Sequence, residues 1–236
     1  MKPLLLALQF MTRLPLPAIA ASDRDFGNAI RWFPLAGFAV GAGVAGAAAT
    51  GAMHGSALGA LFGLIAWVAM TGALHLDGLG DIADATGAAH ADRSRISEVL
   101  ADPHIGSFGV TAIALQILAK FVLLDLALQR GSPLLLLFVP VLARIGPIAW
   151  ALMLPPLHAG FGTLFRRGAN WPVFACWLAV WSLCAGFACP SLLAALMVIP
   201  LWAPWLRARI GGISGDGHGA GVELVETAAL VMLVIA

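Results

Sequence analysis

Three aspartates stand at a spacing that would bring their carboxylates side by side. Asp77, Asp81 and Asp84 are separated by four and then three residues, which places all three on one stripe of an α-helix with about 3.6 residues per turn. Carboxylates stacked so closely repel one another, so a cation should lie among them. Because no histidine or cysteine stands at metal-ligand spacing with them, the oxygen ligands predict magnesium or manganese, held together with substrate phosphates. A solvated acidic helix end is the structural alternative.

Two glycines, Gly78 and Gly80, lie between these carboxylates. Each weakens a helix by about 1 kcal/mol relative to alanine. A missing side chain would let a phosphate approach the backbone and a metal. Helix packing or a local loop would also account for them.

A second acidic cluster follows near the C-terminus, where Asp216 lies in the glycine-rich segment 211–221 and is followed by Glu223 and Glu226. So many glycines predict a loop that precedes the last membrane helix, with both glutamates on one face at the start of that helix. Carboxylates there suit the helix dipole. Two acids in a membrane helix are nevertheless costly unless they face a cation or a polar cavity, so we predict a role in binding metal or substrate.

Other charged or titratable residues lie close to these clusters or inside apolar stretches. Lys120 and Arg144 stand more than a turn inside their apolar segments, where each could contact a phosphate or form a structural ion pair, for instance Lys120 with Asp125. His75 and His104 border the first acidic segment and could act as acid, base or hydrogen-bonding groups. A structural histidine is the alternative for both.

The elements that position these residues must be membrane helices. Of 236 residues, 61% are hydrophobic and only 11% are charged, whereas about a quarter of the residues in a soluble domain are charged. The net charge of +1 and the absence of a long basic run argue against nucleic acid as a partner. We predict a single membrane-embedded domain, 1–236, in an all-α polytopic bundle.

Six or seven transmembrane helices are expected, since each needs about 20 apolar residues. The candidates are 31–52, 57–75, 108–129, 133–154, 171–188, 190–206 and 222–236. The N-terminus predicts an interfacial helix that buries Leu4, Leu5, Leu8 and Met11. In the first span Gly37, Gly41, Ala45 and Ala49 have the spacing of a close helix–helix contact.

The basic residues predict an orientation. With a cytoplasmic N-terminus and seven crossings, one side receives Lys2, Arg13, Arg24, Arg31, Arg93, Arg95, Arg166, Arg167, Arg207 and Arg209, and the other receives only Arg130. This asymmetry predicts that 76–107 and 207–221 both face the cytoplasm. The acidic residues took no part in that count, yet both acidic segments fall on the same side.

Several segments, in order along the chain, resemble the signatures of cobalamin synthase, the adenosylcobinamide-GDP ribazoletransferase family. They are Gln9-Phe10-Met11-Thr12-Arg13-Leu14-Pro15-Leu16-Pro17, Phe33-Pro34-Leu35-Ala36-Gly37, 74–84 with its three aspartates, Asp92-Arg93-Ser94-Arg95, 102–109, Lys120, Arg144 and 211–226. The resemblance covers nearly the whole chain. It departs from the family pattern at Ala85, where a glycine is usual, and at His218, where the residue is commonly apolar.

The resemblance implies a magnesium-dependent phosphotransferase of the bacterial cytoplasmic membrane. The expected reaction joins adenosylcobinamide-GDP to α-ribazole or its 5′-phosphate and releases GMP. Asp77, Asp81 and Asp84 are then the catalytic and metal-binding residues, and magnesium or manganese is the cofactor. Candidate substrate contacts are His75, Arg93, Arg95, Asp102, Lys120, Arg144, Asp216, Glu223 and Glu226.

Expected partners are the two substrates, the lipid bilayer, and either a second copy of the chain or other enzymes of cobalamin assembly. Two rival classes of protein remain. A CDP-alcohol phosphotransferase also carries aspartates and glycines on a membrane helix, but its motif continues through Ala-Arg to two further aspartates, which this chain lacks. A cation-coupled transporter would use intramembrane charges, yet Asp125 is the only acid near the middle of a predicted span.

Overall fold

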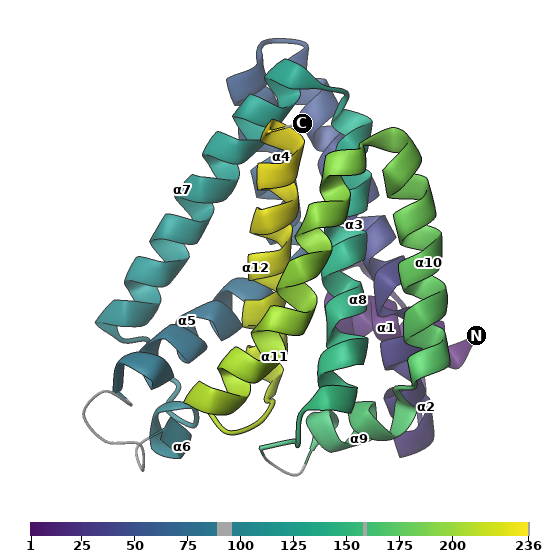
Figure 1. Cartoon of the computed structure of the whole chain (residues 1–236), viewed down its shortest axis with the longest axis vertical. Coiled ribbons are helices and arrows are strands. Elements are labelled where there is room, and N and C mark those ends of the chain that lie inside the picture. Colours follow the sequence, from purple (N-terminus) through teal and green to yellow (C-terminus); the bar gives the residue numbers. More distant parts are fainter. Residues whose placement is uncertain (89–95, 158–159, 236) are drawn as a thin grey trace.

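The chain folds into a bundle of membrane-spanning helices, seen in a computed structural model that describes residues 1–88, 96–157 and 160–235 (Figure 1). Six helical segments are long and apolar enough to cross a membrane: 23–52, 107–130, 133–153, 171–188, 190–209 and 215–234. A seventh candidate is a pair of helices bent by 83°. No strand occurs in the described part of the chain beyond one isolated bridge, Pro156 to Ile213. The predicted all-α polytopic bundle is confirmed.

The elements follow one another along the chain with short connections. They are α1 (Lys2–Met11), α2 (Asp23–Ala29), η1 (Ile30–Trp32), α3 (Phe33–Ala52), α4 (Ser56–Thr71), α5 (Leu74–Ala88), α6 (Ile96–Val99), α7 (Ser107–Arg130), η3 (Pro133–Leu137), α8 (Phe138–Met153), α9 (Phe161–Gly168), α10 (Trp171–Ala188), η4 (Pro190–Met197), α11 (Val198–Arg209) and α12 (Gly215–Val234).

The short helices gather at one end of the bundle. In Figure 1, α2, α5, α6 and α9 lie in its lower half, and the C-terminus lies at the opposite end. The turn before α12 is at the same end as α5 and α6. The two acidic segments therefore share one end of the molecule, as the charge asymmetry predicts.

Small residues let α3 approach its neighbours closely. A Cβ atom on Gly37 would lie 3.0 Å from the Cα atom of Val141, and one on Gly41 would lie 2.9 Å from the carbonyl oxygen of Leu137. The predicted small-residue contact is confirmed at these positions. The prediction that Ala49 belongs to this contact is wrong, because Ala49 is exposed and Ala48 is buried instead. Ala49 is twelve residues after Gly37, which at about 100° per residue puts it roughly 120° around the helix. Ala48 is eleven residues after Gly37 and returns to nearly the same face.

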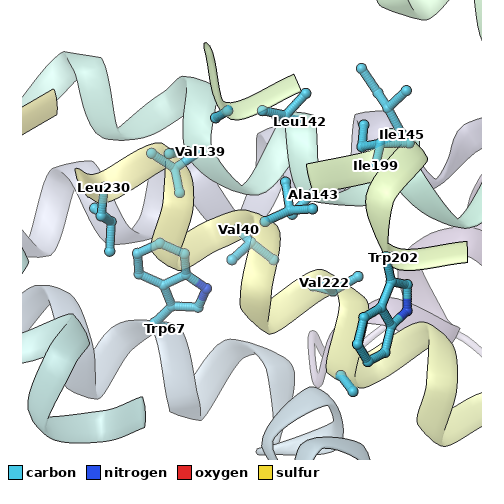
Figure 2. Close-up of a cluster of buried hydrophobic side chains, with 14 of the residues drawn as sticks. Val40, Trp67, Val139, Leu142, Ala143, Ile145, Ile199, Trp202, Val222 and Leu230 are labelled. Carbon is cyan, nitrogen blue, oxygen red and sulfur yellow. The ribbon is translucent and has the colours of Figure 1, made fainter. Parts of the chain in front are cut away.

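A shared hydrophobic core joins the central helices. Figure 2 shows side chains from α3, α4, α8, α11 and α12 packed together, with Val40, Trp67, Leu142, Ile199 and Leu230 among those labelled. Each of these five residues is at most 3% exposed. α8 is the most enclosed helix of this core, since nearly all of its residues from Val139 to Ala151 are buried. Its Arg144 is therefore inside the protein rather than at a lipid-facing surface.

The N-terminal helix is present, but its buried face differs from the prediction. Met11 is buried as expected, whereas Leu6 and Ala7 are buried in place of Leu4, Leu5 and Leu8, which are half-buried. The reason is tertiary: α1 packs against α2 and α3, and Phe10 stacks on Phe33 with ring centroids 5.8 Å apart. Contacts with the bundle decide which side of α1 is covered.

The last helix begins at Gly215 rather than at the predicted residue 222, so most of the expected glycine loop is helical. Ser214 caps the helix by accepting a hydrogen bond from the backbone N–H of Gly217 at 3.0 Å. Gly219 packs on α5, where a Cβ atom would lie 3.3 Å from the Cα atom of His75. Glycine is unfavourable in a helix by itself, but here the close packing that it permits outweighs its low helix propensity.

Two left-handed residues separate α4 from α5. Gly72 ends α4 with φ +62°, and Ala73 follows with φ +59°. The side chain of Arg13 packs on this corner, and its backbone N–H donates to the carbonyl oxygen of Met70 at 2.6 Å. The corner turns α5 away from the direction of α4 and so decides where the aspartate stripe lies.

We therefore expect Gly72→Ala to destabilise the protein and Ala73→Gly to cost nothing. A left-handed non-glycine residue costs about 1–2 kcal/mol, and a Cβ atom at Gly72 would also lie 2.6 Å from Cγ of Arg13. The measurement is the apparent melting temperature of each purified variant in detergent. Equal melting temperatures for both variants would contradict this account of the corner.

Candidate active site

The three aspartates of α5 share one helical stripe, as predicted. Asp77 is exposed and Asp81 and Asp84 are half-buried. The negative charges of Asp216, Asp77 and Asp84 all repel that of Asp81. A fourth carboxylate, from the start of α12, thus joins the predicted stripe.

Asp216 reaches this group because α12 passes directly over α5. A Cβ atom on Gly78 would lie 2.9 Å from both the Cα atom and the carbonyl oxygen of Asp216. The open space beside Gly78 is therefore filled by the backbone of α12. Of the interpretations of this glycine, helix packing is the one that the structure supports. The two acidic segments, which the basic residues predict to lie on one side, thus meet at Asp216.

Asp84 also ties α5 to the start of α7. Its carboxylate accepts hydrogen bonds from the backbone N–H of Gly106 at 2.7 Å and of Gly109 at 2.9 Å. Gly106 is the N-cap residue of α7 and Gly109 lies in its first turn, which has no other side-chain cap. A carboxylate offers about four lone-pair sites, so two accepted hydrogen bonds leave others open for a cation.

Glu223 and Glu226 point elsewhere, into a network of buried charges. Glu226 is fully buried, pairs with Arg144, and accepts from Lys120 Nζ at 2.5 Å and from Trp67 Nε1 at 3.2 Å. Glu223 pairs with Lys120 at 2.6 Å and accepts from Gln116 at 2.7 Å. Lys120 also lies over the ring of Trp67, 4.6 Å from its centroid. We call these residues of α4, α7, α8 and α12 the buried charge network.

The buried charge network corrects several sequence predictions. The sequence allows Lys120 and Arg144 to be either phosphate contacts or members of structural ion pairs, and the structure shows both in ion pairs with Glu226. The partner of Lys120 is not Asp125, whose side chain accepts from Gln129 at 2.9 Å. Glu223 and Glu226 obtain their compensating cations from the protein itself, so the expectation that a metal supplies that charge is wrong. Helix packing, which the sequence does not display, brings these four charges together.

The remaining predicted residues lie in different surroundings. His75 is buried, with Nδ1 3.3 Å from Nη2 of Arg144. Asp102 is exposed and bonds to His104. The backbone N–H of His104, and then its side chain, hold the pKa of the Asp102 carboxyl below its usual value. Arg93 and Arg95 lie outside the described residues.

A cavity of about 380 Å³ opens beside the carboxylates. Asp77 and Asp216 line it, together with His218 and aromatic residues of α1, α3 and α9. Sequence reasoning missed this cavity and also missed Gln116. A glutamine inside an apolar span indicates a buried polar partner, so Gln116 could have pointed to the buried charge network. Nothing in the sequence indicates that Phe10, Phe33 and Phe165 meet.

The oxygen donors at this end of the bundle suit a hard cation. In the described part of the chain, no three histidine, cysteine, aspartate or glutamate side chains converge closely enough to hold a metal ion by themselves. Magnesium is commonly bound through one or two carboxylates, with waters and substrate phosphates completing its coordination. Asp77, Asp81, Asp84 and Asp216 therefore fit a metal that is held jointly with a phosphorylated substrate.

Fold and site together define a polytopic membrane protein with an acidic site at one end of its helix bundle. The chain belongs to the family described as Cobalamin-5-phosphate synthase, which it matches over residues 3–234. It is 50% identical to a protein of Novosphingobium aromaticivorans over 100% of this chain and 97% of the relative. It is also 48% identical to a protein of Laribacter hongkongensis over 100% and 98% of the two chains. Both relatives are named adenosylcobinamide-GDP ribazoletransferase.

A third relative, from Thiobacillus denitrificans, bears the same name and is 45% identical over 98% of this chain and 94% of its own length. No solved structure matches the chain. The match runs through the whole sequence, so it favours the resemblance to cobalamin synthase over the two rival classes.

The buried charge network predicts a large stability effect for Glu226→Gln. The change leaves Arg144 and Lys120 buried without their shared carboxylate, and breaking a buried pair in this way costs about 3–5 kcal/mol. The measurement is resistance to thermal unfolding in detergent, with Asp125→Asn as the matched control, because Asp125 bonds only to Gln129 within the hydrogen bonds and ion pairs described. If Asp125→Asn lowered the unfolding temperature as much as Glu226→Gln does, the stabilising role of the buried charge network would be contradicted.

Proposed function

We propose that this protein is an adenosylcobinamide-GDP ribazoletransferase of cobalamin biosynthesis. The observation that carries the proposal is the full-length identity of 50% to a relative of that name. The site supports it chemically, since two of its four carboxylates, Asp77 and Asp216, line a cavity at one end of the bundle. The substrates would be adenosylcobinamide-GDP and α-ribazole or its 5′-phosphate, and the products adenosylcobalamin or its 5′-phosphate together with GMP.

The reaction exchanges one phosphate ester partner for another. A ribose hydroxyl of the ribazole loses its proton and attacks the phosphorus nearer the cobinamide, forming a new P–O bond. The bond from that phosphorus to the oxygen it shares with GMP breaks, and GMP leaves with the electron pair. Asp77 and Asp81 are the candidate acceptors of the proton, because they lie in the carboxylate group and have no described hydrogen bond to a backbone N–H group.

Magnesium is the proposed cofactor, with manganese as the alternative. Asp77, Asp81, Asp84 and Asp216 would hold it together with the diphosphate. When bound, the metal would offset the negative charge of the diphosphate and of the departing phosphate. The protein's own part is to keep these carboxylates in position: Asp84 is fixed by the start of α7, and Asp216 by the contact of α12 with Gly78.

The acidic end of the bundle is proposed to face the cytoplasm, across the bacterial inner membrane. Ten of the eleven basic residues that lie in loops or at helix ends belong to this side under a seven-crossing arrangement. The bilayer would cover the exposed apolar faces of helices such as α10, of which only 11% of the span is buried in the protein. A second copy of the chain, or another enzyme of cobalamin assembly, is a proposed further partner on such a face.

The activity is tested with purified protein in lipid vesicles, given adenosylcobinamide-GDP, α-ribazole and magnesium. We expect cobalamin and GMP to form in equal amounts, and removal of the metal by a chelator to stop both. Asp77→Asn, Asp81→Asn and Asp84→Asn should each lower turnover by about 100-fold or more, the scale of a lost proton acceptor or metal ligand. Asp125→Asn, distant from the site, is the matched control. Near-normal turnover in any two of the three variants would refute the proposal that these three aspartates hold a metal.

The orientation is tested by cysteine labelling in sealed cells that express a chain without its own cysteines. Gly215 is exposed at the acidic end, and His54 is exposed in the turn between α3 and α4 at the other end, so one variant carries Gly215→Cys and the other His54→Cys. A membrane-impermeant maleimide should label position 54 and should leave position 215 unlabelled until the cells are opened. The reverse pattern would invert the proposed topology.

A further inference from the structure

The cavity beside the carboxylates has a wall of aromatic rings. Phe10 and Phe33 stack with their centroids 5.8 Å apart, and each lies 5.2 Å from the ring of Phe165 in an edge-to-face arrangement. These rings come from α1, α3 and α9, three elements that are distant in the sequence. Such a wall suits a flat apolar ring system, which aromatic side chains contact through their faces and edges.

Two histidines in the same cavity carry unused hydrogen-bonding groups. His218 is 9% exposed, and neither of its ring nitrogens has a hydrogen-bond partner within the described residues. His75 is 4% exposed and uses Nδ1 toward Arg144, which leaves Nε2 unpartnered. A buried polar group without a partner is unfavourable, so a ligand that bonds to His218 would relieve that cost.

The size of the cavity restricts what it can hold. Ligand pockets span about 300–1,000 Å³, and at about 380 Å³ this one has room for a nucleoside but not for a corrinoid that carries a nucleotide. Of the two nucleosides in the proposed reaction, guanosine presents donors and acceptors along most of the edge of its base. The base of ribazole, 5,6-dimethylbenzimidazole, is hydrocarbon except for one free imine nitrogen.

We propose that this cavity binds the base of the ribazole substrate and that His218 donates a hydrogen bond to its imine nitrogen. The identity of the nucleoside rests on the proposed function. The aromatic wall receives the dimethyl-substituted ring, and a neutral imidazole offers one N–H donor to a single acceptor. His218 is a residue that recognises and selects the base, distinct from the carboxylates that act on the reacting groups.

The position of the cavity agrees with this assignment. Asp77 and Asp216 also line it, so a nucleoside whose base is held at His218 would carry its ribose toward the carboxylates. The hydroxyl that attacks phosphorus belongs to that ribose. Base recognition at His218 would therefore place the hydroxyl near its proton acceptor, as the positioning of two reactants requires.

The test compares two ligands that differ by one atom. The riboside of 5,6-dimethylindole has a C–H group where α-ribazole has the imine nitrogen, and it keeps the rest of the shape. Equilibrium binding of each to the intact protein in lipid nanodiscs, measured by calorimetry without adenosylcobinamide-GDP, requires no turnover. The wild-type protein should bind α-ribazole about 5- to 10-fold more tightly than the indole riboside, the scale of one neutral hydrogen bond.

Three variants separate recognition from folding. His218→Leu should weaken α-ribazole about 5- to 10-fold and leave the indole riboside unchanged, so the preference disappears. His218→Gln keeps an N–H donor and should keep most of the preference. His54→Leu, exposed at the other end of the bundle, should bind as the wild type does. In turnover, His218→Leu should raise the KM for α-ribazole by a similar factor, with kcat and the KM for adenosylcobinamide-GDP within about twofold of wild type.

A preference for α-ribazole that persists in His218→Leu would overturn the proposal, as would absence of α-ribazole binding to the wild-type protein. A rise in the KM for adenosylcobinamide-GDP alone would also overturn it, because the cavity would then belong to the other substrate. These results differ from failure of the proposed function, which would appear as no cobalamin from a protein that binds α-ribazole with the expected preference.

Discussion

Opposite charges buried between α7, α8 and α12 are the constraint on which the rest of the structure depends. Glu226 and Arg144 are fully buried and Lys120 is 3% exposed, in a protein whose outer surface faces lipid. Each charge alone would be costly there, and only mutual pairing with further hydrogen bonds makes them tolerable. Pairs of this kind accept few geometries, so they fix how α12 is rotated and how deeply it sits among its neighbours.

The rotation of α12 has consequences at its other end. Glu223 stands seven residues after Asp216, which returns to nearly the same face after about two turns. The contact of Glu223 with Lys120 at 2.6 Å therefore also directs Asp216 toward α5. The intervening Gly219 lets the two helices pass closely at His75. The same placement brings His218 to the wall of the cavity.

The protein thus uses its acidic residues in two ways, separated by depth. Carboxylates inside the bundle are neutralised by lysine and arginine and hold helices together. Near the end of the bundle, half-buried Asp81 instead has the carboxylates of Asp77, Asp84 and Asp216 as its charged neighbours. In the proposed function, this second group would hold a cation and an anionic substrate, and the paired charges inside the bundle would keep the helices that carry it in position.

The sequence by itself determined the features that depend on local spacing and composition: the membrane bundle, most span positions, and the helical stripe of Asp77, Asp81 and Asp84. It also indicated that both acidic segments share one side, because loop charges follow a topological rule. Only the tertiary structure decided that Glu226 pairs with Arg144, 82 residues away, and that 215–221 is helical despite its glycines. Both depend on which helix surfaces meet, and that contact energy is not encoded in the neighbouring residues of either segment.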